Sequence, residues 1–225
     1  MSKGIQIAID GPAAAGKSTI AKITAEKLGF TYIDTGAMYR ALTHKALLEN
    51  IDTTNGEQMA NLLLKTEIVL HPSQDGQRVV LDGQDVSEAI RSREVTEKVS
   101  LVASHNGVRK QMVENQRLLA AQTNVVMDGR DIGTDVLPNA DLKVFMTATA
   151  EERAKRRFLE NEKRGISTPL EQLTAEIIKR DQIDSERAVS PLRQAADAIR
   201  IDTTFMTIEE VAERIKELAE ERVRR

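Results

Sequence analysis

The sequence contains no cysteine and no tryptophan, and its 225 residues include only two tyrosines and four phenylalanines. Without cysteine the chain cannot form a disulfide, hold a metal ion through thiolates or use a cysteine nucleophile. The few aromatic side chains offer little surface on which nucleic-acid bases could stack. Basic residues are not in excess either: the formal net charge is −3 at pH 7, which disfavours electrostatic capture of nucleic acid. A nucleic-acid-binding module is therefore a weak interpretation of this chain.

Long apolar runs are absent as well. No stretch approaches the roughly 18–20 apolar residues that cross a bilayer. Residues 1–4 lead into a predicted strand without the apolar segment of a signal peptide. Hydrophobic residues make up 40% of the chain and charged residues 30%, an ordinary balance for a folded domain with a substantial core. We therefore expect a cytoplasmic protein with no membrane contact.

Among the motifs that are present, residues 11–18 match the phosphate-binding P-loop pattern G-x-x-x-x-G-K-[ST]. A glycine-rich turn between a strand and a helix directs backbone N–H groups towards a phosphate at the positive end of the helix. Lys17 can reach the β- and γ-phosphates, and Ser18 can offer its hydroxyl to Mg²⁺. An ordinary glycine-containing turn is the alternative, but the strand and helix patterns on either side favour a nucleoside triphosphate site. Its predicted residues are Gly11, Pro12, Ala13, Ala14, Ala15, Gly16, Lys17, Ser18 and Thr19.

Strand and helix patterns alternate along the chain, which predicts an α/β fold with a parallel sheet covered on both faces. The expected strands are residues 5–10, 30–33, 125–127, 142–146 and 199–201. The expected helices are residues 17–28, 37–49, 93–104, 108–121, 150–163, 169–186 and 208–222. The S/T-x-x-E signature of a helix start occurs at Thr54, Thr149, Thr168 and Thr207, with Pro169 expected at a first helical position.

One segment interrupts this alternation. Residues 67–86 contain three short apolar runs, separated by turn signals at Asp75-Gly76 and Asp82-Gly83. The pattern predicts a small antiparallel unit inserted into the α/β body.

Two charged segments follow predicted strands, where α/β proteins place their ligands. In the first, Asp-Thr-Gly-Ala-Met-Tyr-Arg at 34–40, the fork of Arg40 can grip a second phosphate, unless it is merely a surface residue. In the second, Asp-Gly-Arg-Asp-Ile-Gly-Thr at 128–134, Asp128 can hold a Mg²⁺-bound water and Arg130 can meet a phosphate. Asp131 can accept a hydrogen bond from cytosine N4. A turn with capping aspartates is the alternative.

Arginines recur at helical spacing further along the chain. Arg153, Arg156 and Arg157 share one helix face, and the Arg164-Gly165 pair after them is a plausible hinge. They predict a lid that closes over phosphates, or else a basic surface stripe paired with nearby glutamates. Arg180, Asp184 and Arg187 also share a face, with phosphate and ribose contacts or a plain Arg180–Asp184 ion pair as the alternatives. The three histidines show no catalytic or metal-binding pattern.

Together these segments resemble the bacterial cytidylate kinases, the ATP:CMP phosphotransferases among the P-loop nucleoside monophosphate kinases. The resemblance extends from about Ile5 to Arg222, and Ala14 stands where many relatives have glycine. It implies a five-stranded parallel core (residues 1–60, 105–150 and 190–225) with the strand at 125 between the first two strands. It also implies a monophosphate-binding insert at about 61–104, a lid at about 151–168, and a monomer.

The resemblance further implies transfer of the γ-phosphoryl group of ATP to CMP or dCMP, with Mg²⁺. On this basis Lys17, Arg130, Arg153, Arg157 and Asp128 are expected to be catalytic, with Ser18 binding Mg²⁺ partly through water held by Asp128. CMP is expected to contact Thr35, Arg40, Ser100, Arg109, Arg130, Asp131, Arg180, Asp184 and Arg187. The alternatives are a uridylate kinase, a nucleotide sensor and a GTPase-type switch, and against the last the sequence contains no Asn-Lys-x-Asp guanine motif.

Overall fold

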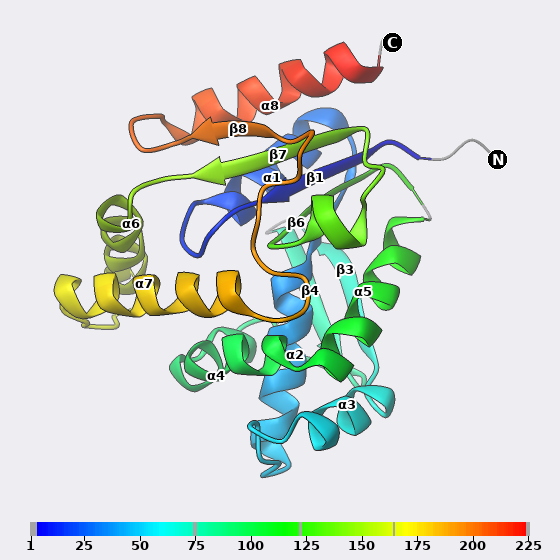
Figure 1. Cartoon of the computed structure of the whole chain (residues 1–225), viewed down its shortest axis with the longest axis vertical. Helices are drawn as coiled ribbons and strands as arrows, with labels where there is room; N and C mark the ends of the chain where they lie inside the picture. Colours follow the sequence, from blue (N-terminus) through cyan, green and yellow to red (C-terminus); the bar gives the residue numbers. More distant parts are fainter. Residues whose placement is uncertain (1–3, 74–75, 122, 164, 224–225) are drawn as a thin grey trace.

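β1 (Gln6–Asp10) is the central strand of a five-stranded parallel sheet in the computed structural model, which describes residues 4–73, 76–121, 123–163 and 165–223. The strand order is β2-β6-β1-β7-β8. Figure 1 shows β8, β7, β1 and β6 following one another across the sheet. The other strands are β2 (Thr31–Asp34), β6 (Val125–Gly129), β7 (Leu142–Thr147) and β8 (Ile199–Asp202). All four pairings are parallel, so the predicted fold class and the position of the strand at 125 between the first two are confirmed.

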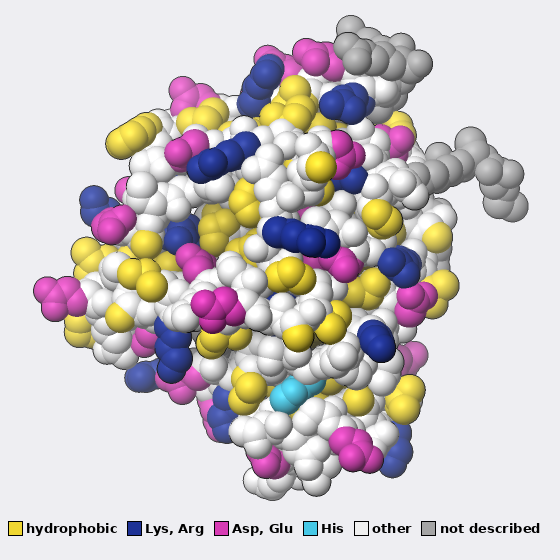
Figure 2. Space-filling view, viewed as in Figure 1, with side chains coloured by type: hydrophobic (Ala, Val, Ile, Leu, Met, Phe, Trp, Pro, Cys, Tyr) yellow, Lys and Arg dark blue, Asp and Glu magenta, His cyan; other side chains and the backbone are white. Residues whose placement is uncertain are grey.

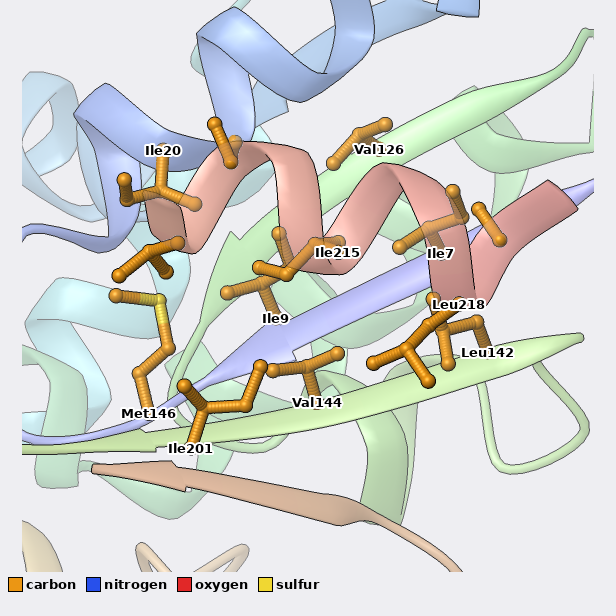
Figure 3. Packing of buried hydrophobic residues seen from close by; sticks show 14 of the residues in the cluster. Ile7, Ile9, Ile20, Val126, Leu142, Val144, Met146, Ile201, Ile215 and Leu218 are labelled. Atoms are coloured by element: carbon orange, nitrogen blue, oxygen red, sulfur yellow. The ribbon is translucent and has the colours of Figure 1, made fainter. Parts of the chain in front are cut away.

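Helices cover both faces of this sheet, which explains why every residue of β1 is buried. On one face, α1 (Lys17–Leu28) and α8 (Ile208–Val223) pack on β1 and β7. Figure 3 shows Ile215 of α8 above Ile9 and Val144. On the other face, Ala8 packs in a cluster with residues of β2, β6 and α5 (Asn106–Ala120). Neighbouring residues of β1 thus point to opposite faces, as the two-residue period of a strand requires.

The predicted antiparallel insert is confirmed as a second sheet with the order β3-β4-β5. It comprises β3 (Ile68–Ser73), β4 (Gly76–Leu81) and the short β5 (Gln84–Asp85). Asp82 and Gly83 form the tight turn between β4 and β5 with positive φ angles of 48° and 82°, as the Asp-Gly signal predicts. Of the other turn signal, Asp75 lies outside the described residues. Val86 does not continue the last strand but is buried in the core of the insert.

The side chain of Gln77 connects this insert to the parallel sheet through two hydrogen bonds. Its side-chain Nε2 donates to the carbonyl of Tyr32 at 3.0 Å, and its Oε1 accepts from the backbone N–H of Asp34 at 3.1 Å. Both groups belong to β2, the edge strand of the parallel sheet. The glutamine amide therefore pairs with the strand backbone as another strand would.

Helices surround the insert and connect it to the core. α2 (Thr35–Leu48) and α3 (Gly56–Leu64) precede the insert strands, while the 3-10 helix η1 (Ala89–Arg91) and α4 (Arg93–Ser104) follow them. α2 begins two residues earlier than predicted because the Asp34 side chain caps it, accepting from the Ala37 N–H at 2.9 Å. The division into core, insert and lid stays a prediction.

The helix-start signatures had mixed outcomes. Thr207 and Glu210 form a reciprocal capping box at the start of α8, and Thr149 caps α6 (Ala150–Lys163), as predicted. The Thr54 signature marks α3, which begins one residue later with Asn55 as its cap. At α7 (Leu170–Glu186) the prediction was wrong: Pro169 is the residue before the first helical position, and no side chain caps that end.

A further short helix that the sequence did not predict is the π-helix at Ile132–Val136, which directly follows the charged segment after β6. None of the helices in the described residues is long and apolar enough to cross a membrane. Acidic and basic side chains lie interspersed on the face seen in Figure 2, in keeping with the small net charge.

Candidate active site

The P-loop connects the end of β1 to the start of α1. Gly11 has a φ of 151°, and a Cβ atom there would lie 2.2 Å from the Met146 carbonyl oxygen, so only glycine fits. Ala14 has a φ of 58°, a left-handed conformation that glycine adopts more readily than alanine. The Lys17 ammonium donates to the Pro12 carbonyl at 2.7 Å and is buried. The loop is therefore folded around the space that a phosphate would fill.

This loop forms one wall of a cavity of about 710 Å³. The predicted site residues that line it are Ala13, Ala14, Ala15, Gly16, Lys17, Ser18, Thr19, Arg40, Asp128, Arg130, Arg157 and Arg180. Segments far apart in the sequence thus meet around one cavity, with cations from α1, α2, α6 and α7 and from the end of β6. A cavity with so many cations is suited to a ligand that carries several negative charges.

Oxygen atoms at the base of this cavity fit a magnesium ion. The Ser18 hydroxyl donates to one oxygen of Asp128 at 2.9 Å, and the Tyr32 hydroxyl donates to the other at 2.9 Å. Magnesium prefers such hard oxygen donors together with water and phosphate oxygens. Within the described part of the chain, no cluster of three or more histidine and acidic side chains could hold a metal ion. A metal ion beside Ser18 and Asp128 would therefore need further ligands from a bound molecule.

Burial shifts the acid–base properties of Lys17 and Asp128. Burial, and then the neighbouring Arg130, lower the pKa of Lys17 to about 7. Burial, and then the neighbouring Asp34, raise the pKa of Asp128 to about 7. In each case the charged form has lost water without a full set of protein partners, which is the state that a bound polyphosphate or metal ion would relieve.

Beside the cavity, arginines and aspartates alternate in a buried ion-pair chain. Arg109 lies 3.4 Å from Asp131, and Arg187 lies 3.8 Å from both Asp131 and Asp184. This ion-pair chain reaches the cavity at Arg130, which lines the cavity and donates to Asp184 at 2.9 Å. Asp131, Asp184, Arg109 and Arg187 do not line the cavity themselves. They are joined to it through Arg130.

The pKa values of the two aspartates in this ion-pair chain are shifted in opposite directions. Burial outweighs Arg109 and Arg187 and raises the pKa of Asp131. Burial acts in the same direction on Asp184, but the charges of Arg130 and Arg180 outweigh the effect of burial. The pKa of Asp184 therefore lies below its ordinary value. Asp184 is therefore the carboxylate that the surrounding guanidinium groups keep ionised.

Arg180 lies inside this charged region with one hydrogen-bond donor unsatisfied. Its Nε atom is buried and has no hydrogen-bond partner, and the side chain lines the cavity. Burial, and then the charge of Arg130, lower its pKa to about 9. A buried donor without an acceptor is costly, so the site is incomplete without an anion.

The three arginines predicted to share one helix face of α6 make different contacts. Arg153 donates to the carbonyls of Ala13 and Ala148 and to Asp181, and it does not line the cavity. Arg157 lines the cavity and lies 3.3 Å from Glu160. Arg156 also lines it and donates to the Thr203 carbonyl at 2.6 Å. The hinge residue Arg164 lies outside the described residues.

Comparison with known proteins decides the family. A family model described as cytidylate kinase matches residues 7–221. The chain belongs to the cytidylate kinase family. It is 56% identical over 224 residues to the cytidylate kinase of Bacillus subtilis (strain 168), with 100% of both chains covered. It is 59% identical over 223 residues to the cytidylate kinase of Lysinibacillus sphaericus (strain C3-41), covering 99% of this chain and 100% of that protein.

The fold of this cytidylate kinase family member also occurs in a solved structure of an uncharacterized protein from Eubacterium ventriosum ATCC 27560. The TM-score is 0.51 at 12% identity, with 97% of this chain and 99% of that chain covered. The likeness concerns the fold alone. The resemblance to cytidylate kinases that the motifs predicted is confirmed by the family match.

The remaining predicted site residues lie close to the cavity without lining it. The Thr35 hydroxyl donates to the Asp128 carbonyl at 2.7 Å, and Ser100 is buried on α4. Ser100 lies one turn after Thr96, whose hydroxyl accepts from Arg40 at 2.8 Å. Gly11 and Pro12 begin the P-loop, where a Cβ atom at Gly11 would meet the Met146 carbonyl and the Pro12 carbonyl accepts from Lys17.

Sequence reasoning missed several residues that the structure places at this site. The Tyr32 hydroxyl donates to Asp128, and the Thr96 hydroxyl accepts from Arg40. The Tyr39 hydroxyl accepts from Arg109 at 3.0 Å, and the guanidinium carbon of Arg109 lies 5.1 Å from the centre of the Tyr39 ring. Tyr39 lies in the quoted 34–40 segment, so its position carried a signal. Tyr32 and Thr96 have no distinguishing spacing, and only the tertiary structure identifies them.

Proposed function

We infer that this protein transfers the γ-phosphoryl group of ATP to the phosphate of CMP or dCMP, giving ADP and CDP or dCDP. The bond between the γ-phosphorus and its bridging oxygen breaks, and an oxygen of the acceptor phosphate forms the new bond. The observation that carries this conclusion is one cavity that unites the P-loop with Arg40, Arg130 and Arg180 from other elements. Two polyanions need such a cavity in order to react.

The acceptor needs no general base. Its phosphate has a second pKa of about 6 and is mostly dianionic at pH 7. The protein instead aligns the two anions and compensates the charge that spreads over the transferred group. Lys17 and the P-loop N–H groups are proposed to hold the β- and γ-phosphates, with Arg130 and Arg157 on the transferred group.

ATP is proposed to bind with Mg²⁺, held by Ser18 and by Asp128 through water. When bound, the ion would neutralise phosphate charge and help to align the transferred group. The fit rests on the 2.9 Å contact between Ser18 and Asp128, which places two oxygen donors beside the P-loop lysine. Arg153, whose guanidinium contacts the Ala13 carbonyl, is proposed to act by supporting the P-loop.

CMP is proposed to occupy the region of the ion-pair chain. Arg40, Arg130 and Arg180 would bind its phosphate, with Arg187 next to them and Asp184 on the ribose. Ser100, Arg109 and Asp131 are proposed to read cytosine, with the Asp131 carboxylate accepting from N4, and Thr35 completes the set. Uracil presents an acceptor at the same place, so UMP is expected to be the poorer substrate.

Closure of the lid at about 151–168 and of the insert at about 61–104 over the core is proposed to exclude water, which would otherwise accept the phosphoryl group. The monomeric state and the cytoplasmic location stay predictions from the sequence.

The test is a coupled assay of ADP formation with ATP, Mg²⁺ and a panel of CMP, dCMP, UMP, AMP and GMP. CMP and dCMP are expected to give the highest kcat/KM, and omission of an acceptor should leave only trace ADP. ATP binding without CMP-dependent ADP would instead identify a nucleotide sensor. Equal use of UMP and CMP would contradict the role given to Asp131.

A further inference from the structure

Asp10, the last residue of β1, makes a contact that links the two nucleotide regions. One oxygen of its carboxylate accepts from the backbone N–H of Ile132 at 2.8 Å, and the other accepts from that of Gly133 at 2.7 Å. Asp10 is 5% exposed, so water does not replace these bonds. Its own backbone continues directly into Gly11 of the P-loop.

The two N–H groups open the π-helix at Ile132–Val136. The first N–H groups of a helix have no partner within it, and an aspartate satisfies them and interacts favourably with the positive helix end. Here the aspartate comes from a distant strand, 122 residues away in sequence for Ile132. The carboxylate therefore fixes the position at which the chain leaves β6 and enters this helix.

The residues just before these N–H groups belong to the ion-pair chain. Asp131 contacts Arg109 and Arg187, and Arg130 contacts Asp184 and lines the cavity. Their backbone is continuous with Ile132, so a displacement of Ile132 and Gly133 moves both side chains. The other end of the π-helix has separate support, because Arg117 donates to the carbonyls of Asp135 and Val136.

Gly133 shows that the contact is sterically close. A Cβ atom at this position would lie 3.3 Å from the Asp10 carboxylate and 3.2 Å from the Lys143 side chain. Ordinary van der Waals contact for such an atom begins at longer distances, so a larger residue would push the carboxylate away from the N–H groups. The backbone at 133 thus approaches Asp10 as closely as it does because it lacks a side chain.

We propose that Asp10 is a positioning residue for acceptor recognition: from the triphosphate-binding strand, its carboxylate holds Arg130 and Asp131 in the arrangement that binds CMP. The inference rests on the proposed function. It predicts that a change at Asp10 impairs the use of CMP more than the use of ATP, although Asp10 is adjacent to the P-loop in sequence.

The experiment uses Asp10→Asn in the full-length chain. The amide keeps the shape, but its NH₂ group faces a backbone N–H, so one of the two bonds is lost. The KM for CMP is expected to rise about tenfold or more, as for loss of one hydrogen bond to a charged group, while the KM for ATP changes less than about threefold. Calorimetric Kd values for CMP and ATP should show the same split. Hydrogen exchange at the Ile132 and Gly133 amides should accelerate.

Asp141→Asn is the matched control. The Asp141 carboxylate accepts from the backbone N–H of Gln6 at 2.8 Å, so it also binds β1, at the opposite end of the strand from the cavity. This variant is expected to leave both KM values unchanged. If it reproduces the CMP defect, general weakening of β1 rather than positioning explains the result.

Gly133→Ala is the second variant, because it disturbs the same contact without altering the P-loop strand. It is expected to raise the KM for CMP selectively, and it replaces Asp10→Asn as the test if that variant does not fold. The proposal is overturned if both KM values rise equally or if the KM for CMP is unchanged in the variant that folds. Failure of the proposed function is distinguishable, since the unmodified protein would then form no ADP in response to CMP.

Discussion

The Ser18 hydroxyl donates a hydrogen bond of 2.9 Å to the Asp128 carboxylate, across 110 residues of sequence. It joins the first turn of α1 to the end of β6, next to the central strand. With the Tyr32 hydroxyl on its second oxygen, the Asp128 carboxylate is held in a single orientation. This geometry makes Asp128 the residue whose removal should most directly weaken metal-dependent chemistry.

Asp128→Asn is expected to lower kcat by about 10–100-fold, the effect of losing one or two charge-assisted contacts. The amide cannot compensate the metal charge, so the Mg²⁺ concentration that gives half-maximal rate should also rise. A titration of Mg²⁺ at fixed ATP and CMP measures both effects. Asp197→Asn, which alters an exposed partner of Lys143, is the control, and an unchanged Mg²⁺ dependence in Asp128→Asn would contradict the assignment.

Lys17→Ala is expected to reduce kcat/KM by about 10²–10³-fold, since it removes a donor aimed at the transferred phosphate. The fold should remain, because the Lys17 ammonium hydrogen-bonds within the P-loop itself, to the Pro12 carbonyl. CMP-dependent ADP release measures the rate, and circular dichroism checks the fold. Lys27→Ala, on the exposed side of α1, should stay near normal. Near-normal turnover of the Lys17 variant would refute its role.

Binding of metal-free ATP at pH 8 is expected to be accompanied by proton uptake. The pKa of Lys17 is about 7 in the free protein, so its amine is mostly neutral at pH 8. A bound polyphosphate favours the ammonium form and raises this pKa, so the sign is uptake. Calorimetry in two buffers of different ionisation enthalpy measures it. Lys17→Ala should abolish the uptake, and Asp128→Asn separates any contribution from that carboxylate. Proton release would contradict the prediction.

Asp131→Asn is expected to weaken CMP binding at least about tenfold and to leave ATP binding nearly unchanged, because the amide cannot accept from cytosine N4 in the same way. It also removes the buried counter-charge of Arg109 and one of the two beside Arg187, which keeps Asp184. The free energy of unfolding should therefore fall by about 3 kcal/mol, as when one partner of a buried ion pair is removed. Calorimetry and urea unfolding measure the two effects. Equal losses for CMP and ATP would make Asp131 structural.

Arg180→Met is expected to stabilise the nucleotide-free protein slightly, by about 1 kcal/mol, because it removes a cation whose buried Nε has no partner. The same change should reduce kcat/KM about a hundredfold, the effect of losing one strong phosphate contact. Thermal unfolding and the ADP assay test the opposite signs. Lys179→Met, at the exposed neighbouring position, controls for loss of charge. A destabilised variant with normal activity would contradict this account.

Local patterns predicted most of the fold. The P-loop is a continuous segment whose chemistry depends on neighbours in sequence, and the Asp82-Gly83 turn needs only residues that accept a positive φ. By contrast, the extent of α3 and the whole π-helix at Ile132–Val136 were not predicted. The Thr54 signature marked the start of α3, but this helix has only nine residues with glycine at the first, and no helical range was assigned to it. The π-helix is held by Asp10 from another strand and has no strong local signal.

Helical spacing placed Arg153, Arg156 and Arg157 on one face but did not reveal their partners. In the structure Arg153 contacts the backbone of Ala13, while Arg157 lines the cavity. The sequence by itself determined most of the elements, the phosphate loop and the family, because these depend on short-range pattern and on continuous motifs. Only the tertiary structure decided which charges meet, including Asp10 with Gly133 and Asp131 with Arg187, because such pairs form when distant segments pack and water leaves.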